Sequence, residues 1–210
     1  MTTDETRRRV ARATVRVRGE GGEGQGVLVP GRFILTATHC IAWTAEGFMA
    51  LDDCSIQEIE TPDGQLLKVD VRAVEPVSDV AVLGALDTQE FPAEADAFQA
   101  FCDNTAPACV LNGGLEPNQT LSIHALTHHG NWVKGQATAF GFRPSKIAVV
   151  FDTQIDGGTS GGPVVDGDGR VVTLVSHSAA SPHGHKSHGR CPLLHYCLPV
   201  WAWQEITDNR

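Results

Sequence analysis

The sequence predicts an all-β protein in which antiparallel sheets curl into barrels or pack as a sandwich. Short runs of alternating apolar and polar residues recur along the chain, which is the pattern of half-buried strands. Turn-forming pairs such as Asn112-Gly113 and Asp168-Gly169 separate these runs. Glycine is abundant, with 22 of the 210 residues, and favours many tight turns. Strands at this spacing are typical of barrels and sandwiches.

The expected strands follow one another along the chain, and helical patterns are confined to its ends. The strand-like runs cover residues 13–18, 26–30, 32–38, 66–74, 79–86, 120–128, 133–142, 146–152, 163–166 and 170–178. Residues 4–12 and 198–208 have helical patterns, with Pro199 near the start of the second. The stretch 87–107 is acidic and lacks a strand pattern, so we expect it to connect two β halves. The expected organisation is one domain over 1–210, with a first β half at about 13–90, the connection at about 87–107, a second β half at about 108–200 and a C-terminal helix at about 199–208.

The composition is that of a soluble globular protein and argues against several kinds of partner. Hydrophobic residues make up 41% of the chain and charged residues 20%, which is ordinary for a globular domain with a sizeable core. The net charge of −9 argues against binding to nucleic acid or to an anionic membrane, because both need a positive face. The only basic run is expected to decorate an N-terminal helix; it consists of Arg7, Arg8, Arg9 and Arg12.

The sequence predicts a cytoplasmic location. No stretch approaches the roughly 18 apolar residues that cross a bilayer. The N-terminal segment "MTTDETRRRVARATVRV" lacks the apolar core of a secretory signal peptide. Because disulfides are rare in reducing compartments, we expect free thiols. The six cysteines are Cys40, Cys54, Cys102, Cys109, Cys191 and Cys197.

Three separated segments place a histidine, an aspartate and a serine in small-residue settings. "LTATHCI" ends a strand at His39, "VSDVAVLGAL" opens a strand just after Asp79, and "DGGTSGGPV" surrounds Ser160 with glycines. Each segment alone has a simple interpretation as a structural histidine, a turn aspartate or a loop serine. Together, on a β-rich chain, they match one of the known chain orders of the Ser-His-Asp triad.

The three motifs resemble those of the trypsin-like (chymotrypsin-fold) serine peptidases. "TATHC" matches the family's histidine motif, "SDVAVL" its aspartate motif and "GTSGGPV" its serine motif, and the resemblance spans roughly residues 13–205. In character the chain is most similar to the intracellular and bacterial forms, including the protease domains of the HtrA type. The resemblance implies two six-stranded antiparallel β-barrels with short terminal helices. It also implies a serine endopeptidase that acts on protein or peptide substrates.

The resemblance assigns a role to each motif residue. Ser160 is expected to be the nucleophile, His39 to take its proton, and Asp79 to orient the histidine. The backbone N–H groups of Gly158 and Ser160 are expected to form the oxyanion hole that stabilises the tetrahedral intermediate. The glycines of this segment let the main chain adopt the conformation in which two donors converge on one oxygen.

Residues that contact the substrate are expected on two segments. The family position at the base of the specificity pocket, six residues before the serine, falls on Gln154, which offers no carboxylate to a lysine or arginine. Ser176, His177 and Ser178 resemble the segment that pairs with an extended substrate as an added strand. Ser176 also falls where the family supports the aspartate by a hydrogen bond. His177 either lines the pocket and favours an acidic or polar side chain, or is a solvated residue at its rim.

The chain departs from the secreted members of the family in two respects. Thr159, in place of an aspartate, precedes the nucleophile, and no activation-type "IVGG" start is present. Trypsin-like proteolytic activation is therefore not expected. Cys40 follows the histidine, but the preceding strand "GQGVLVP" holds no cysteine to pair with it. Both departures indicate an intracellular enzyme.

The segment 181–197, "SPHGHKSHGRCPLLHYC", is rich in side chains that bind zinc in other proteins. These are His183, His185, His188, Cys191, His195 and Cys197. Their spacing fits no standard zinc module, so we prefer a long polar loop on the rim of the substrate cleft, followed by a strand. We expect neither a metal site nor a cofactor.

A second function remains open from the sequence: a catalytically silent or latent protease-like domain that binds peptides. Such a domain would be regulated by a protein partner or by fused domains. The complete set of triad residues and glycines favours an active enzyme, because degenerate members lose at least one of these parts. No PDZ-like module is recognisable in the sequence, so HtrA-style oligomerisation is not carried over.

Overall fold

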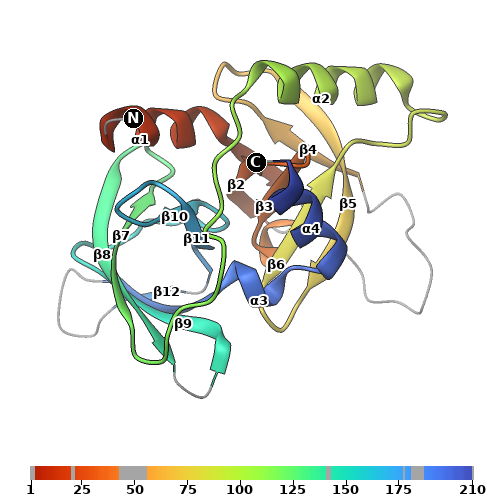
Figure 1. The fold of residues 1–210 in the computed structure, drawn as a ribbon. Helices are drawn as coiled ribbons and strands as arrows, with labels where there is room; N and C mark the ends of the chain where they lie inside the picture. Colours follow the sequence, from red (N-terminus) through yellow and green to blue (C-terminus); the bar gives the residue numbers. More distant parts are fainter. Residues whose placement is uncertain are drawn as a thin grey trace.

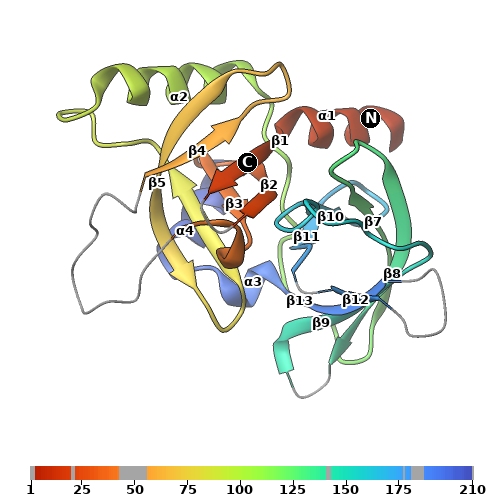
Figure 2. The same cartoon turned by 180° about the vertical axis from the view of Figure 1, so that it is seen from behind.

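Two β-sheets lie side by side and form most of the protein (Figure 1; seen from behind in Figure 2). The computed structural model describes residues 3–19, 22–42, 56–140, 143–176, 178–180 and 187–209. The strands of the first sheet are β1 (Thr14–Gly19), β2 (Gly22–Val29), β3 (Phe33–Thr36), β4 (Ile56–Glu60), β5 (Leu66–Glu75) and β6 (Val80–Gly84). Those of the second are β7 (Thr120–Leu126), β8 (Trp132–Phe140), β9 (Arg143–Phe151), β10 (Pro163–Val165), β11 (Val171–Leu174), β12 (Ser178–Ala180) and β13 (Ser187–Pro192).

The first sheet closes into a barrel in the order β1-β2-β3-β6-β5-β4. All of its strand pairs are antiparallel. In β5, Leu67, Val69 and Val71 are buried inside the barrel, whereas Lys68 between them is exposed. This alternation follows from the two-residue repeat of a strand, which sends successive side chains to opposite faces.

The second sheet is curled and has the strand order β11-β10-β7-β8-β9-β13-β12. Its buried face carries a core of its own that includes Ile123, Val149 and Phe151. The expected all-β, chymotrypsin-like fold is therefore confirmed, with one closed barrel and one curled sheet. The second half differs in detail from a six-stranded barrel, because the short strand β12 adds a seventh strand at one edge.

The larger hydrophobic core extends from the barrel into the second sheet. Besides the barrel residues it includes Val165 from β10 and Val171 and Leu174 from β11. Burial of apolar surface is the main force that holds elements together. A shared core therefore fixes the two sheets relative to one another at their junction.

Among the elements that the sequence pattern did not predict are the strand β4 and a helix in the stretch 87–107. The strand β4 was missed because Gln57 occupies one of its two buried positions, which obscures the alternation. The stretch 87–107, expected only as a connection, contains the helix α2 (Pro92–Asn104). Pro92 at its first turn and several alanines favour this helix. Ala95 and Phe98 are its buried residues.

The N-terminal helix α1 (Thr3–Ala13) uses the basic run to join parts of the chain that are distant in sequence. The Arg7 guanidinium lies 5.8 Å from the centre of the Trp132 ring in the second sheet. Arg9 donates through Nε and Nη2 to the carbonyl of Pro107, at 2.8 and 2.5 Å. The run therefore decorates a helix, as expected; Arg7 joins that helix to the second sheet, and Arg9 joins it to the end of the stretch 87–107.

The C-terminal helix α4 (Val200–Asp208) packs against the barrel, after the short helix α3 (Leu194–Cys197). Ala202 and Ile206 are buried in the larger core, and Trp201 meets Phe33 edge to face at a centroid distance of 5.5 Å. Figures 1 and 2 show α1 and α2 on the same side of the molecule. No helix in the described part of the chain has both the length and the apolar character needed to cross a bilayer.

The cysteines that the structure describes are free thiols, as expected. They are Cys40, Cys102, Cys109, Cys191 and Cys197, while Cys54 lies outside the described residues.

Candidate active site

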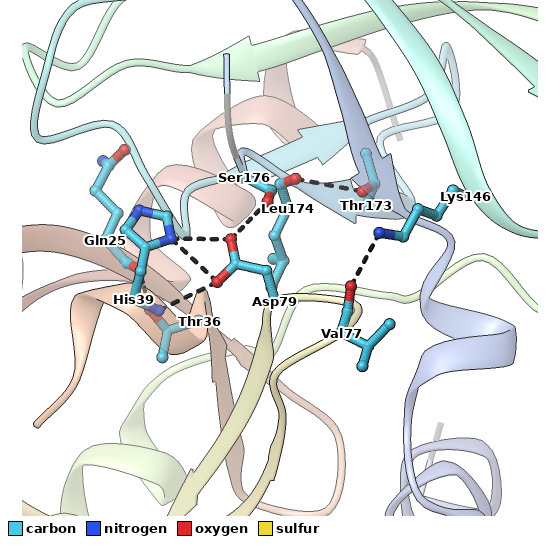
Figure 3. Close-up of polar contacts among 9 residues, drawn as sticks. All are labelled: Gln25, Thr36, His39, Val77, Asp79, Lys146, Thr173, Leu174 and Ser176. Carbon is cyan, nitrogen blue, oxygen red and sulfur yellow. Dashed lines mark hydrogen bonds and ion pairs between the residues drawn. The ribbon is translucent and has the colours of Figure 1, made fainter. Parts of the chain in front are cut away.

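The pairing of β3 with β6 brings His39 and Asp79 together. Thr36 lies opposite Ala81 in this pair, so the residues that follow β3 and precede β6 are adjacent. His39 belongs to a 3-10 turn, η1 (Thr38–Cys40), and Asp79 immediately precedes β6. The His39 Nδ1 atom lies 3.0 and 2.9 Å from the two carboxylate oxygens of Asp79 (Figure 3). The backbone N–H of His39 donates to Oδ1 of the same carboxylate at 3.1 Å.

The turn that carries Asp79 has an uncommon backbone conformation. Asp79 has a φ of 61°, in the left-handed region that few residues other than glycine, asparagine and aspartate adopt. Asp79 is only 8% exposed. The carbonyl of Val77 in the same turn accepts a hydrogen bond from Lys146 Nζ at 2.9 Å (Figure 3). Since Lys146 lies in β9, the second sheet helps to hold the turn that presents the carboxylate.

Ser176 reaches Asp79 from the other sheet. It follows β11, is buried, and donates through Oγ to Oδ2 of Asp79 at 2.5 Å (Figure 3). This is the contact that the resemblance implied for Ser176. Asp79 therefore accepts hydrogen bonds from His39 on the barrel side and from Ser176 on the second-sheet side. The candidate site lies at the junction of the two sheets.

The loop with Ser160 is tied to both sheets near the histidine. The Ser160 carbonyl accepts a hydrogen bond from the backbone N–H of Gln25 in β2 at 2.7 Å. The Gln25 carbonyl in turn accepts from Thr36 Oγ1 at 2.7 Å (Figure 3). On the other side, the N–H of Gly161 donates to the carbonyl of Val175 at 2.7 Å. The loop is thus attached to the segment that leads to His39 and to the residue that precedes Ser176.

Gly161 explains why the serine motif needs glycine directly after the serine. Its φ is +77°, which disfavours any side chain. A Cβ atom at this position would also lie 2.1 Å from the Gln25 carbonyl oxygen and 2.9 Å from the Ala37 nitrogen. These are backbone atoms that cannot move aside. Only glycine therefore lets the serine loop approach the histidine segment this closely.

The expected oxyanion loop precedes the serine. Gly158 has a φ of +81°, again a conformation that favours glycine, and both Gly158 and Ser160 are half-buried.

The hydrogen bonds at Asp79 shift the ionisation of both partners. Burial alone would raise the pKa of Asp79, but the hydrogen bonds from His39 and Ser176 outweigh burial and lower it below the ordinary value. The hydrogen bond with Asp79 raises the pKa of His39, and a hydrogen bond with Cys40 raises it further, by a smaller amount. The carboxylate therefore stabilises the positively charged form of the imidazole.

The residues expected to contact the substrate are only partly described. Gln154 is exposed, and the next residue, Ile155, is anchored through its N–H to Oγ of Ser187 at 2.8 Å. The backbone of Ser178 begins β12 and lies opposite Gly189 of β13. His177 lies outside the described residues.

The side chains of the His/Cys-rich segment do not gather at one point in the part that the structure describes. Within those residues, no group of three or more His, Cys, Asp or Glu side chains could hold a metal ion. Burial raises the pKa of Cys191 to about 11, which disfavours the thiolate that binds zinc. Cys197 Sγ instead donates to the Ser145 carbonyl at 3.1 Å. His183 and His185 lie outside the described residues.

Three residues near the site were not recognised from the sequence. Gln25 and Lys146 contact the backbone of segments far along the chain, and Thr36 contacts the backbone of Gln25 on the neighbouring strand. No motif marks such contacts. For Thr36 a weak signal exists, because it lies three residues before His39 within "LTATHCI".

The described architecture is the chymotrypsin-like fold of the trypsin-like serine peptidases. The chain belongs to the trypsin-like peptidase domain family, whose sequence model matches residues 24–174. Among solved structures it is similar to the serine endoprotease from Yersinia pestis, with a TM-score of 0.62 and 19% identity over 100% of this chain and 68% of that one. It is also similar to the inactive form of the Rv3671c protease, with a TM-score of 0.55 and 15% identity over 98% of this chain and 90% of that one.

A mutant of Rv3671c from Mycobacterium tuberculosis, also in an inactive form, gives a TM-score of 0.56 at 14% identity, over 97% of this chain and 89% of that one. At these identities the structural likeness concerns the fold. A search of curated proteins gave no significant match.

Proposed function

We propose that this protein cleaves internal peptide bonds through a triad of Ser160, His39 and Asp79. The observation that carries the proposal is the position of the Asp79 carboxylate at the junction of the sheets. It accepts hydrogen bonds from both His39 Nδ1 and Ser176 Oγ. A buried carboxylate that orients a half-exposed histidine is the arrangement that general-base catalysis needs. The serine loop, tied to Gln25 and Val175, supports the third member.

The proposed reaction proceeds through an acyl-enzyme. Ser160 Oγ attacks the substrate carbonyl carbon while its proton passes to His39 Nε2, because Nδ1 is engaged with Asp79. The tetrahedral intermediate then collapses: the C–N bond breaks, and the proton on His39 passes to the leaving amine. Water repeats the sequence on the ester and releases the acid. Asp79 stabilises the imidazolium that forms in each half-reaction.

The proposed oxyanion hole consists of the N–H groups of Gly158 and Ser160. The positive φ of Gly158 supports this assignment, because donors two residues apart converge only where the main chain turns sharply between them. Fixed donors in such a site stabilise the developing charge without reorganising, and loss of one donor costs about 10²–10³-fold in rate.

Substrate recognition is proposed to involve Gln154 and the strand-like segment from Ser176 to Ser178. Ser176 places the start of this segment at the site through its bond to Asp79. An extended peptide that adds to the segment gains backbone hydrogen bonds irrespective of its sequence. The neutral Gln154 gives no preference for lysine or arginine before the cleaved bond.

The proposal is tested with a mixture of unstructured peptides of varied sequence, analysed by mass spectrometry before and after incubation. New termini within the peptides, formed by the wild type and not by Ser160→Ala, would support an endopeptidase. Intact peptides, together with a Ser160 that still reacts with a fluorophosphonate, would instead favour the latent peptide-binding domain. Loss of terminal residues alone would contradict an endopeptidase.

Ser176→Ala is expected to lower kcat by about tenfold or more while the protein stays folded. The substitution removes a hydrogen bond to a charged carboxylate, an interaction of roughly 1.5–3 kcal/mol. Asp79 would then orient His39 less firmly. Steady-state kinetics on one cleaved peptide measures this change in kcat. The matched control is Ser122→Ala, at an exposed position of β7. A wild-type kcat in Ser176→Ala would show that the bond does not contribute.

Activity is expected to rise with pH, with a midpoint above the value of about 6.5 for an ordinary histidine. His39 must be neutral to accept the serine proton, and its bond with Asp79 raises its pKa. Asp79, whose pKa is lowered, stays ionised throughout this range. The pH profile of kcat/KM measures the midpoint directly. A midpoint below 6.5 would mean that Asp79 does not stabilise the imidazolium.

A further inference from the structure

Thr159, between the two proposed oxyanion donors, is fully buried and hydrogen-bonded. Thr159 is 0% exposed. Its Oγ1 accepts the backbone N–H of His128 at 3.1 Å. His128 lies in the turn between β7 and β8, in a part of the second sheet that is distant in sequence from the serine loop. A buried polar side chain placed next to the nucleophile calls for an explanation beyond packing.

The backbone of Thr159 is held as well as its side chain. Its carbonyl accepts the N–H of Gly162 at 3.0 Å. The Thr159 carbonyl and the Ser160 N–H belong to the same planar peptide unit. Fixing the carbonyl and the side chain of Thr159 therefore fixes the direction in which the Ser160 N–H points.

The turn that supplies the donor is itself rigid. The N–H of Thr127 donates to the Asn131 carbonyl at 2.8 Å, and the N–H of Gly130 donates to the Thr127 carbonyl at 2.8 Å. The N–H of Asn131 donates to Thr127 Oγ1 at 3.1 Å. These three bonds close the turn from both ends. The His128 N–H therefore offers the serine loop a fixed point of attachment.

The same turn also touches the other proposed donor. A Cβ atom on Gly158 would lie 3.3 Å from Cγ of the His128 ring, so the glycine packs directly against this ring. The turn thus meets the serine loop at two successive residues, through the hydrogen bond at Thr159 and through packing at Gly158.

We propose that the Thr159 hydroxyl is a positioning group that keeps the oxyanion hole in its working orientation. The inference rests on the proposed function, because it concerns the donors of that same site. Donors stabilise the oxyanion effectively only when they are oriented before the reaction. The bond from the β7–β8 turn supplies this orientation from within the chain. It makes Thr159 a residue that acts through the Ser160 N–H, not one that touches the substrate.

The test compares Thr159→Val, which keeps the shape but removes the acceptor, with Thr159→Ser, which restores it. The probe is a fluorophosphonate: Ser160 Oγ bonds to phosphorus, fluoride leaves, and the serine proton passes to His39. The phosphoryl oxygen occupies the oxyanion site. Thr159→Val is expected to lower the maximal labelling rate by about 10-fold to 100-fold, since it leaves a buried N–H without a partner. The probe concentration at half-maximal rate stays unchanged, and Thr159→Ser restores the rate.

Thr120→Val serves as the matched control, because it removes an exposed hydrogen bond between the hydroxyls of Thr120 and Thr138 on the β7–β8 hairpin. It should label at the wild-type rate. A Thr159→Val protein that labels like the wild type, or a Thr159→Ser protein as slow as Thr159→Val, would overturn the positioning role. Should Thr159→Val fail to fold, Thr159→Ser and Thr159→Ala form a second pair that differs only in the hydroxyl: faster labelling of the serine variant supports the role, and equal rates overturn it.

Failure of the proposed function gives a different result. In that case the wild type itself would not be labelled, or Ser160→Ala would be labelled equally well, and the role of Thr159 falls with it. Labelling of Ser160 in the wild type with no effect of Thr159→Val overturns the positioning role alone.

Discussion

Ser160→Ala is expected to lower the rate of peptide hydrolysis by about 10⁶-fold, because no other group can form the acyl-enzyme at this position. The fold should not change, since the loop is held through the Ser160 carbonyl and the Gly161 N–H, which the substitution leaves in place. The rate is measured on one peptide that the wild type cleaves. Circular dichroism and the thermal midpoint show whether the variant is folded.

A matched control for this variant is Ser122→Ala, on an exposed position of β7. It should hydrolyse the peptide at the wild-type rate. Hydrolysis by Ser160→Ala within tenfold of the wild type would remove Ser160 as the nucleophile and would point to a different serine or to water activated by His39.

Asp79→Asn is expected to lower kcat by about 10⁴-fold with little change in KM. The asparagine amide can donate to His39 Nδ1. The imidazole then carries its proton on Nε2 and cannot accept the proton of Ser160. The variant also removes the carboxylate whose hydrogen bond raises the pKa of His39, so the midpoint of the pH profile should fall. Kinetics over a pH series measure both effects on the same samples.

Asp70→Asn provides the control for a lost carboxylate in the barrel. Asp70 lies in β5, where its carboxylate is 3.5 Å from the Arg72 guanidinium at the surface. Surface pairs of this kind contribute little, so activity should remain that of the wild type. A near-wild-type kcat for Asp79→Asn would mean that another group orients His39.

The sequence was sufficient to predict the β class and most strands, because their alternation records which face is buried. It failed where a buried position carries a polar residue, as at Gln57 in β4. It also failed for α2, whose apolar residues give no strong periodic pattern along the helix. In both cases the contact that buries the element is tertiary and leaves no local signal.

The candidate site shows the same division. His39, Asp79 and Ser160 could be proposed from the sequence as a triad, since their motifs lie within short local segments. The supports of these residues could not be found in this way. The Gln25 N–H and the His128 N–H are backbone donors that any residue would supply, so side-chain identity carries no record of them. Their roles become visible only when distant segments are placed together.

The most direct test of the central claim is site-mapped labelling of the wild-type protein with a fluorophosphonate. We expect one adduct per chain by intact mass, located by peptide mapping on Ser160, and no adduct in Ser160→Ala. We also expect strongly slowed labelling in Asp79→Asn. An adduct on any other residue, or labelling that does not depend on Asp79, would contradict a triad of Ser160, His39 and Asp79.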